Sequence, residues 1–264
     1  MAPIRYKFAG IFVDALNRKT AVARIVDLAL QGGSSYVCVT GAHGVIESQT
    51  NPEFRAALLG AATVTPDGAP LAWFGKLVCG RFVSKVTGWP LVFGVFDDAQ
   101  AWPKLRHFFV GASRPVTDGM VTALSARDPG CNIVGTWNPP FRAMTEPEID
   151  ELARLITSKN ANVIWIGIST PRQEILAQKL TGRLPAGVAI SCGAAFDFVA
   201  GTKPIVPELI SKLGFEWLFR LLTEPKRLWR RYFVLIPQFF ALFVVELIRL
   251  VFGRASGASR TSTP

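Results

Sequence analysis

The sequence predicts an α/β protein with a mostly parallel β-sheet and helices on both of its faces. Short β-rich runs alternate with longer helical patterns along the chain, and several of the runs are continuously apolar. Alternation of strand and helix is typical of βαβ units, which build parallel sheets. A run such as Val163-Ile164-Trp165-Ile166 indicates a strand that is buried on both faces. Helices must therefore cover both sides of the sheet.

The alternation gives the positions of the strands in order. We expect them at Tyr36–Thr40, Ala62–Thr65, His107–Gly111, Asn132–Gly135, Val163–Ile168 and Val188–Cys192.

Composition limits the class of protein. Half of the 264 residues are apolar, enough for one large domain or a domain with an appendage. The net charge of +10 favours polyanionic partners such as nucleic acid, anionic lipid or phosphorylated substrates. The four cysteines have no CxxC spacing, which fits a reducing cytoplasm. Met1 to Gly10 lacks the pattern of a signal peptide, so we expect catalysis inside the cell.

The composition changes after Gly214, which divides the chain. We expect an α/β core over residues 1–213, a basic and apolar helical appendage over 214–254, and a disordered tail over 255–264. From Tyr232 to Val245 there are 14 uncharged residues, whereas a membrane-spanning helix needs roughly 20. The pattern therefore favours an interfacial or re-entrant membrane segment over a spanning one. The alternative is a helix that packs on the core or on a partner subunit.

Each predicted strand runs into a polar or glycine-containing turn. In an open parallel sheet the carboxyl ends of the strands share one edge, where ligands normally bind. The candidate chemistry therefore converges on this edge. The turns are TGAHG at Thr40–Gly44, TPDG at Thr65–Gly68, GASRP at Gly111–Pro115, GISTPRQE at Gly167–Glu174 and CGAAFDF at Cys192–Phe198.

Asp67 follows a strand directly, in Pro66-Asp67-Gly68. One interpretation is a turn in which Asp67 caps the following helix. The other is a general base, because an aspartate carboxylate is ionised at neutral pH and can accept the proton of an attacking sugar hydroxyl. Local sequence leaves both open.

The segment Ser169–Glu174 predicts the start of a helix, with Thr170 as N-cap and Gln173 completing a capping box. A helix amino end at the ligand edge also offers amide donors to phosphate, and Arg172 adds positive charge. Gln173 or Glu174 could then bind ribose or base hydroxyls.

Two histidines and one acidic pair remain. His107 opens a strand, which favours a structural role, whereas His43 lies in a turn at the binding edge and is open to either role. No spacing resembles a metal site, and the pair Asp97-Asp98 shows no link to a donor. We therefore expect metal-independent chemistry and no cofactor. The absence of GxSxG, GxGxxG and GxxxxGK[ST] disfavours serine hydrolases, classical dinucleotide enzymes and P-loop proteins.

Taken in order, seven motifs between Tyr36 and Tyr232 resemble the WecG/TagA/CpsF glycosyltransferases. They are VTGAHGVIE, NPEFRAAL, VTPDGAPLAW, VTGWPL, GISTPRQE, CGAAFDFVAG and GFEWLFRLLTEPKRLWRRY. The resemblance implies a Rossmann-like enzyme that inverts the anomeric carbon without metal. It implies transfer of a hexose, N-acetylhexosamine or N-acetylmannosamine from a nucleotide-diphosphate sugar to a polyprenyl-diphosphate-linked glycan, as in teichoic acid or exopolysaccharide synthesis.

The resemblance also implies roles for individual residues. Asp67 matches the proposed catalytic base, and Thr40 matches an active-site threonine. The donor site would comprise Gly111, Ser169, Arg172, Gln173 and Glu174. The lipid diphosphate and the membrane would meet Arg220, Arg227, Arg230 and Arg231 of the appendage.

The sequence departs from the family at two places. Many members read T-P-N where this chain reads Thr40-Gly41-Ala42-His43, so the asparagine's role is unfilled or passes to His43. Many also carry an arginine in a KRAP-like element, where this chain has Lys203-Pro204-Ile205-Val206-Pro207. These departures concern the identity of donor or acceptor, and not the reaction class.

Two other functions compete with a transferase. The first is a noncatalytic, membrane-associated scaffold of a polysaccharide assembly complex, against which Asp67, Thr40 and the Gln173-Glu174 pair argue. The second is a nucleic-acid binder, which is disfavoured because the densest basic cluster lies beside an apolar segment. We expect a peripheral protein at the cytoplasmic face of the bacterial inner membrane, and a homo-oligomer is compatible with the sequence.

Overall fold

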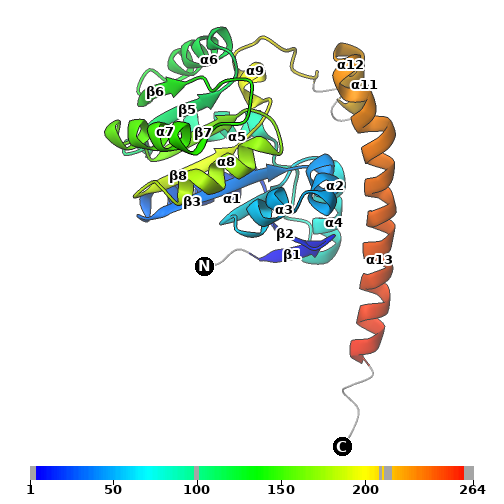
Figure 1. Ribbon diagram of the computed structural model, residues 1–264. Helices are drawn as coiled ribbons and strands as arrows, with labels where there is room; N and C mark the ends of the chain where they lie inside the picture. The colour runs from blue at the N-terminus through cyan, green and yellow to red at the C-terminus, as the bar shows by residue number, and fades with distance from the viewer. Residues whose placement is uncertain (1–3, 98–100, 208–209, 211–215, 259–264) are drawn as a thin grey trace, which may run out of the picture.

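A six-stranded sheet lies at the centre of the computed structural model, which describes residues 4–97, 101–207, 210 and 216–258 (Figure 1). The strand order is β4-β3-β8-β7-β5-β6, and neighbouring strands run parallel. All six predicted strands are confirmed: β3 (Ser34–Thr40), β4 (Thr63–Pro66), β5 (His107–Gly111), β6 (Ile133–Trp137), β7 (Val163–Gly167) and β8 (Gly187–Ser191).

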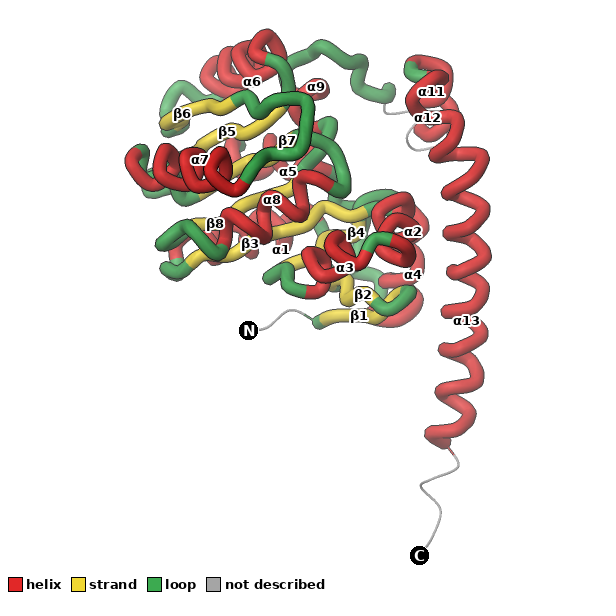
Figure 2. Tube along the Cα trace, in the orientation of Figure 1, coloured by secondary structure: helices red, strands yellow, loops and turns green. Residues whose placement is uncertain are grey.

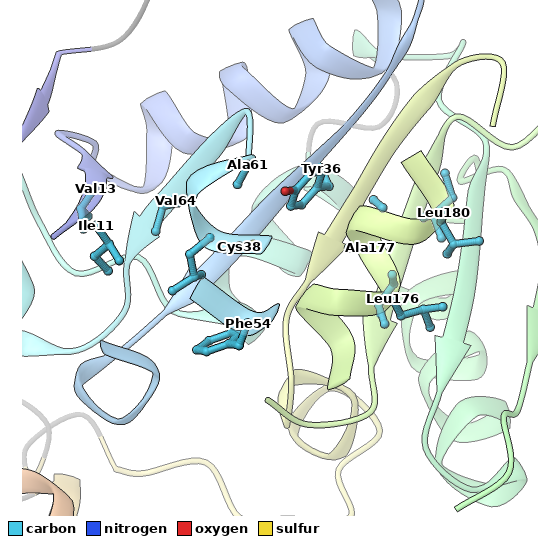
Figure 3. Close-up of a cluster of buried hydrophobic side chains, with 14 of the residues drawn as sticks. Ile11, Val13, Tyr36, Cys38, Phe54, Ala61, Val64, Leu176, Ala177 and Leu180 are labelled. Atoms are coloured by element: carbon cyan, nitrogen blue, oxygen red, sulfur yellow. The ribbon is translucent and has the colours of Figure 1, made fainter. Parts of the chain in front are cut away.

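Helices cover both faces of this sheet, as predicted (Figure 2). One face packs against α1 (Arg18–Leu30), α5 (Gly88–Phe96), α6 (Arg114–Arg127) and α9 (Ala195–Val199). The other packs against α2 (Ala42–Thr50), α3 (Pro52–Leu59), α7 (Glu146–Ser158) and α8 (Arg172–Thr181). Figure 3 shows the second core, in which Cys38 and Val64 of the sheet meet Phe54 of α3 and Leu176 of α8.

An antiparallel hairpin that the sequence analysis does not predict precedes the sheet. It comprises β1 (Arg5–Phe8) and β2 (Ile11–Asp14). Its turn residues Ala9 and Gly10 have φ values of 46° and 80°, as a two-residue turn with the twist of the strands requires. The hairpin packs on α4 (Ala69–Cys79), where the rings of Phe8 and Phe74 meet edge to face with centroids 4.8 Å apart.

Asp14 joins this hairpin to the edge of the sheet. Its buried carboxylate accepts the backbone N–H of Val64 at 2.7 Å and the Nε–H of Arg5 at 2.9 Å. Arg5 in turn donates to the carbonyl oxygen of Ala62 at 2.8 Å. Burial raises the pKa of Asp14, and the hydrogen bonds from Val64 and Arg5 oppose that rise. The buried carboxylate of Asp14 is therefore stabilised by Val64 and by the partly exposed guanidinium of Arg5.

The C-terminal segment is helical and lies along one side of the molecule (Figure 1). It consists of α11 (Glu216–Thr223), α12 (Pro225–Arg230), a π-helical turn (Arg231–Leu235) and α13 (Ile236–Ala258). Phe239 is buried and stacks on Phe8 of the hairpin at 5.1 Å, while Phe243 meets Phe74 at 5.6 Å. One side of α13 therefore belongs to the core of the protein.

The helix is longer than its run of uncharged residues. Leu228–Phe252 forms 25 residues of continuous helix, and an 18-residue window within it has a mean hydropathy of 2.1. By length and composition this helix is long and apolar enough to cross a membrane. Glu246 and Arg249 interrupt the run but pair with each other at 2.7 Å. Helix continues to Ala258, four residues into the tail expected at 255–264, and residues 259–264 lie outside the described part, as does residue 214 at the expected start of the appendage.

We predict that Asp14→Ala destabilises the fold by about 3 kcal/mol, because it leaves the Val64 N–H and the Arg5 guanidinium without their buried acceptor. Urea unfolding followed by circular dichroism measures the loss. Asp27→Ala on the exposed side of α1 is the control and should change stability by less than about 0.5 kcal/mol. Equal stability of the two variants would contradict the role given to Asp14.

Candidate active site

The carboxyl ends of the strands meet at one edge of the sheet, as the sequence predicts. Thr40 lies opposite Pro66 across β3 and β4. Ile166 of β7 lies opposite Ser191 of β8, and Gly111 of β5 lies opposite Gly167. The turns that follow these strands therefore line one continuous edge.

Asp67 is half-buried at the outer end of this edge. Its backbone N–H donates to the carbonyl oxygen of Thr40 at 2.9 Å. Gly41 packs directly beside it, because a Cβ at Gly41 would lie 3.0 Å from the Asp67 carbonyl oxygen and 3.6 Å from Oδ2. Asp67 does not cap α4, whose N-cap residue is Gly68 with a φ of 91°. The interpretation of Asp67 as the N-cap residue of this helix is therefore wrong.

Thr40 ends β3, the strand that pairs with β4 before Asp67, and His43 follows in α2. Thr40 is buried, and its hydroxyl has no hydrogen-bond partner among the described residues. His43 is half-buried in the first turn of α2. A buried hydroxyl without a partner is uncommon in a folded protein and needs a ligand, a water or a functional explanation.

A cavity of about 520 Å³ opens beyond the other strand ends. It lies where β5, β6, β7 and β8 end, and both apolar and charged side chains line it. Among the lining residues are Ser113, Ile168, Ser169, Arg172, Gly193, Asp197 and Lys203. Volume and lining are those of a small-molecule site, with a few polar groups set in an apolar wall.

A proline-rich loop forms one wall of this cavity. The loop follows β6 and carries Pro139, Pro140 and Phe141, whose side chain is 90% exposed. Arg172 of α8 reaches the loop, donating to the carbonyl oxygens of Phe141 at 3.4 Å and Ile168 at 3.3 Å. Both acceptors are neutral, and no carboxylate pairs with Arg172 among the described residues. Its positive charge is therefore available at the cavity.

The helix start at Ser169–Glu174 differs from the prediction. The N-cap residue is Pro171 and makes no side-chain capping bond, so α8 begins at Arg172 and the predicted capping box is wrong. The Thr170 hydroxyl has another partner, because it donates to Oε1 of Glu174, four residues further along the chain, at 2.9 Å. Ser169 is exposed and has a φ of 73°.

Gln173 and Glu174 are buried beneath the cavity rather than exposed in it. They are 2% and 0% exposed, respectively. Oε1 of Glu174 also accepts a hydrogen bond from Nε2 of Gln173 at 2.9 Å. Burial raises the pKa of Glu174 to about 7, against the lowering effect of these hydrogen bonds. A direct bond from Glu174 to ribose would require this pair to move, so its place in the donor site stays a prediction.

Gly111 and His107 have structural explanations. A Cβ at Gly111 would lie 2.6 Å from the carbonyl oxygen of Gly167, so only glycine lets β5 and β7 approach here. His107 is buried, accepts the indole N–H of Trp165 at 3.3 Å on Nδ1 and has a pKa lowered by burial to about 3. The structural role predicted for His107 agrees with these contacts.

The appendage contributes to a second cavity of about 190 Å³. Arg220 lies over the ring of Phe198 at 5.0 Å, and its Nε is buried without a partner among the described residues. Lys85 and Trp89 line the same cavity. Lys203 connects core and appendage by pairing with Asp197 at 3.2 Å and Glu224 at 3.1 Å. Arg230 is exposed, and the side chains of Arg227 and Arg231 lie outside the described part.

Among the described residues no group of three histidine, cysteine, aspartate or glutamate side chains is arranged to hold a metal ion. Asp97 pairs with Arg127 at 2.6 Å, and Asp98 lies outside the described residues.

Comparison with known proteins identifies the family of this chain. The sequence profile of the glycosyl transferase WecG/TagA/CpsF family matches residues 6–251, nearly the whole chain. The chain belongs to this family. It is therefore a glycosyltransferase, and the resemblance carried by the seven motifs is confirmed.

Two relatives of this glycosyltransferase are named N-acetylglucosaminyldiphosphoundecaprenol N-acetyl-β-D-mannosaminyltransferase. The protein from Bacillus spizizenii is 28% identical over 193 residues, which cover 73% of this chain and 72% of the relative. The protein from Bacillus subtilis is 26% identical over 213 residues, covering 77% and 80%.

The structure adds residues of the glycosyltransferase that the sequence analysis does not single out. The loop Asn138–Arg142 follows β6, whose turn the analysis omits, although the rule that strand ends carry ligands applies to it equally. Asp197 lies inside the CGAAFDF motif but is not distinguished there from its neighbours. The feature of the sequence that could have singled out Asp197 is its acidic side chain within the otherwise apolar helical turn Ala195–Val199.

Proposed function

We propose that the protein transfers a sugar from a nucleotide-diphosphate donor to a polyprenyl-diphosphate-linked N-acetylglucosamine, with inversion at the anomeric carbon. The observation that carries the proposal is the placement of the 520 Å³ cavity and Asp67 on the same edge of one parallel sheet. The names of the two Bacillus relatives supply the acceptor and suggest N-acetylmannosamine as the sugar.

The donor would lie across the strand ends. Neighbouring strands are about 4.8 Å apart, so β7 and β4 are separated by about 14 Å along the edge. A nucleotide sugar has three consecutive parts that can bridge this span. The nucleoside would occupy the cavity beside the loop of Phe141, the diphosphate would meet Ser169 and Arg172, and the sugar would point toward Asp67. Gly111 would contribute indirectly, because its lack of a side chain lets β5 and β7 approach each other at this edge.

Asp67 would act as the general base. Inversion requires one carboxylate that accepts the proton of the acceptor hydroxyl as that oxygen attacks the anomeric carbon and the nucleoside diphosphate leaves. Thr40 and His43 would orient the acceptor beside it. The leaving diphosphate would be stabilised by Arg172 and by the amide groups that begin α8.

The acceptor diphosphate would bind at the second cavity, between the core and the appendage. Arg220 and Lys85 line that cavity with the aromatic side chains of Trp89 and Phe198. An arginine can engage phosphate oxygens in pairs. Arg227, Arg230 and Arg231 would meet the headgroups around the lipid.

The outward side of α13 would rest on the anionic cytoplasmic face of the inner membrane. Apolar residues four or three apart are exposed along it: Phe240 at 45%, Val244 at 53%, Ile248 at 50% and Val251 at 65%. The opposite side is occupied by contacts such as that of Phe239 with Phe8. A helix that is packed on one side and apolar on the other suits an interface better than a span.

We predict that Asp67→Asn lowers turnover by about 10² to 10⁴, the usual contribution of a positioned base, while donor binding changes little. Transfer from a nucleotide sugar to a short-chain prenyl-diphosphate N-acetylglucosamine measures it, with thermal unfolding as the folding control. Near-normal turnover by a folded variant would remove Asp67 from the reaction. A wild-type protein that binds both substrates without turnover would favour the scaffold function.

We predict that turnover survives an excess of EDTA, because arginine and helix amide groups are assigned the phosphate charge. Initial rates with and without chelator measure this. Loss of activity that magnesium or manganese restores would show that a divalent cation takes part.

We predict that replacing Phe240, Val244 and Ile248 together by serine weakens binding to anionic vesicles by about 10- to 100-fold. Flotation with vesicles of phosphatidylglycerol and phosphatidylethanolamine measures the change. The control is Leu59→Ser, which alters an equally exposed apolar side chain on α3 and should float normally. Unchanged flotation of the triple variant would indicate that α13 contacts a partner or a second copy instead.

A further inference from the structure

Helix α4 has one buried and one exposed face, and both carry large apolar side chains. The buried face includes Leu71 and Phe74, and the ring of Phe74 packs against Phe8 of the hairpin. The exposed face includes Trp73 and Leu77, which are 56% and 58% exposed. Residues four apart in a helix lie on the same side of it, so these two side chains are neighbours at the surface. A helix at a protein surface usually carries polar residues on its outer face, so this face calls for a partner.

Phe82 extends this exposed face beyond the end of the helix. A Cβ at Gly80 would lie 3.6 Å from Cδ1 of Phe82, so the phenyl ring lies beside Gly80. Gly80 is three residues after Leu77 and seven after Trp73, which puts it on the same side of the helix. Phe82 is itself 45% exposed. Trp73, Leu77 and Phe82 therefore form one apolar surface, which we call the α4 stripe, whereas exposed apolar side chains that are scattered singly need no explanation.

The segment that carries the α4 stripe has only positive charge. No aspartate or glutamate occurs between Gly68 and Phe96, whereas Lys76, Arg81 and Lys85 do. Lys76 and Arg81 are exposed, and neither forms an ion pair with another of the described residues. A surface with unpaired cations and no anion in its own segment favours an anionic partner.

The residue types favour an anionic lipid surface over a protein as this partner. Lysine is depleted in protein–protein interfaces, yet Lys76 lies within the α4 stripe, next to Leu77. At a membrane interface a tryptophan ring lies at the level of the headgroups, and a lysine extends its charged end toward the phosphates. Trp73 and Lys76 are three residues apart on one side of the helix and match this arrangement.

Helix α4 also lies beside the helix that we place on the membrane. Phe74 of α4 meets Phe243 of α13 with ring centroids 5.6 Å apart (Figure 1). The segment that follows α4 carries Lys85 to the second cavity, where the acceptor diphosphate is proposed to bind. A membrane contact through α4 would therefore hold the core close to the lipid that anchors the acceptor.

We propose that the α4 stripe, together with Lys76 and Arg81, is a second membrane-docking surface, formed by the α/β core and not by the appendage. Its apolar side chains enter the interfacial layer of an anionic bilayer, while the two cations meet lipid phosphates. The inference rests on the proposed function for the place of the protein at a membrane. It adds that the core itself binds lipid, and contact through two elements fixes the orientation of the core more firmly than contact through one helix.

Flotation of the full-length protein with vesicles of phosphatidylglycerol and phosphatidylethanolamine tests this surface. The double variant Trp73→Ser, Leu77→Ser should bind about 10- to 100-fold more weakly, because two large side chains no longer leave water. The control Leu30→Ser alters an exposed apolar side chain on α1 and should float normally. The charge variant Lys76→Gln, Arg81→Gln should bind about 5- to 30-fold more weakly, and this loss should vanish with uncharged phosphatidylcholine vesicles. Thermal unfolding establishes that each variant is folded.

Fluorescence quenching locates Trp73 directly and needs no destabilising substitution. Trp73→Phe keeps an aromatic ring and should float like the wild type. Brominated lipid quenches a tryptophan that lies within the bilayer, so the wild type should lose more emission on binding than Trp73→Phe does. Equal quenching of the two proteins would overturn the proposal, whatever the serine variants show.

The remaining outcomes also decide the question. Normal flotation of the serine double variant, with loss of binding only in the α13 triple variant, overturns the α4 surface and leaves the proposed function standing. A wild type that does not bind anionic vesicles overturns the membrane contact of the proposed function, and this inference with it. A wild type that sediments as a dimer, with a double variant that is a monomer and floats normally, would assign the α4 stripe to a second copy of the chain instead.

Discussion

The site depends on backbone contacts that only glycine permits. At Gly111 a Cβ would lie 2.6 Å from the carbonyl oxygen of Gly167, and at Gly88 it would lie 2.6 Å from that of Cys192. At Gly41 a Cβ would lie 3.0 Å from the carbonyl oxygen of Asp67. These contacts bring the loops after the strands of one edge together without side chains between them. The polar groups at the edge are therefore held by backbone, which is stiffer than any surface side chain.

The sequence predicts the strands well because burial on both faces leaves an unambiguous apolar run, as in β7. The hairpin β1–β2 is missed although its signal is present, since Arg5-Tyr6-Lys7-Phe8 alternates polar and apolar residues before the turn at Ala9-Gly10. Asp14 joins the hairpin to the sheet, and its partners are the backbone of Val64, 50 residues away, and Arg5. A contact of that range has no signature in local sequence.

The predicted positions of the turns and the predicted capping box have different outcomes. The rule that strand ends carry ligands finds the turns of Asp67 and Ser169 because it needs only the strand positions. The capping box at Thr170 fails because a local rule assumes that the hydroxyl has no better partner than a backbone amide. The carboxylate of Glu174 is such a partner, and its demand for donors comes from burial against the sheet. Burial of α8 on β3 and β8 is a tertiary property.

In the appendage, a count of uncharged residues underestimates the length of the apolar helix. Counting uncharged residues ends the apolar run at Val245, but helix geometry puts Glu246 and Arg249 on neighbouring turns, where they pair. The pair lets the apolar helix continue to Phe252. Phe239 and Phe243 then attach this helix to Phe8 of the hairpin, and the hairpin is attached through Asp14 to β4, the strand that precedes Asp67. A load on α13 at a membrane would thus reach the edge of the sheet that carries Asp67 through packed aromatic rings and the hydrogen bond from the Val64 N–H to the buried carboxylate of Asp14.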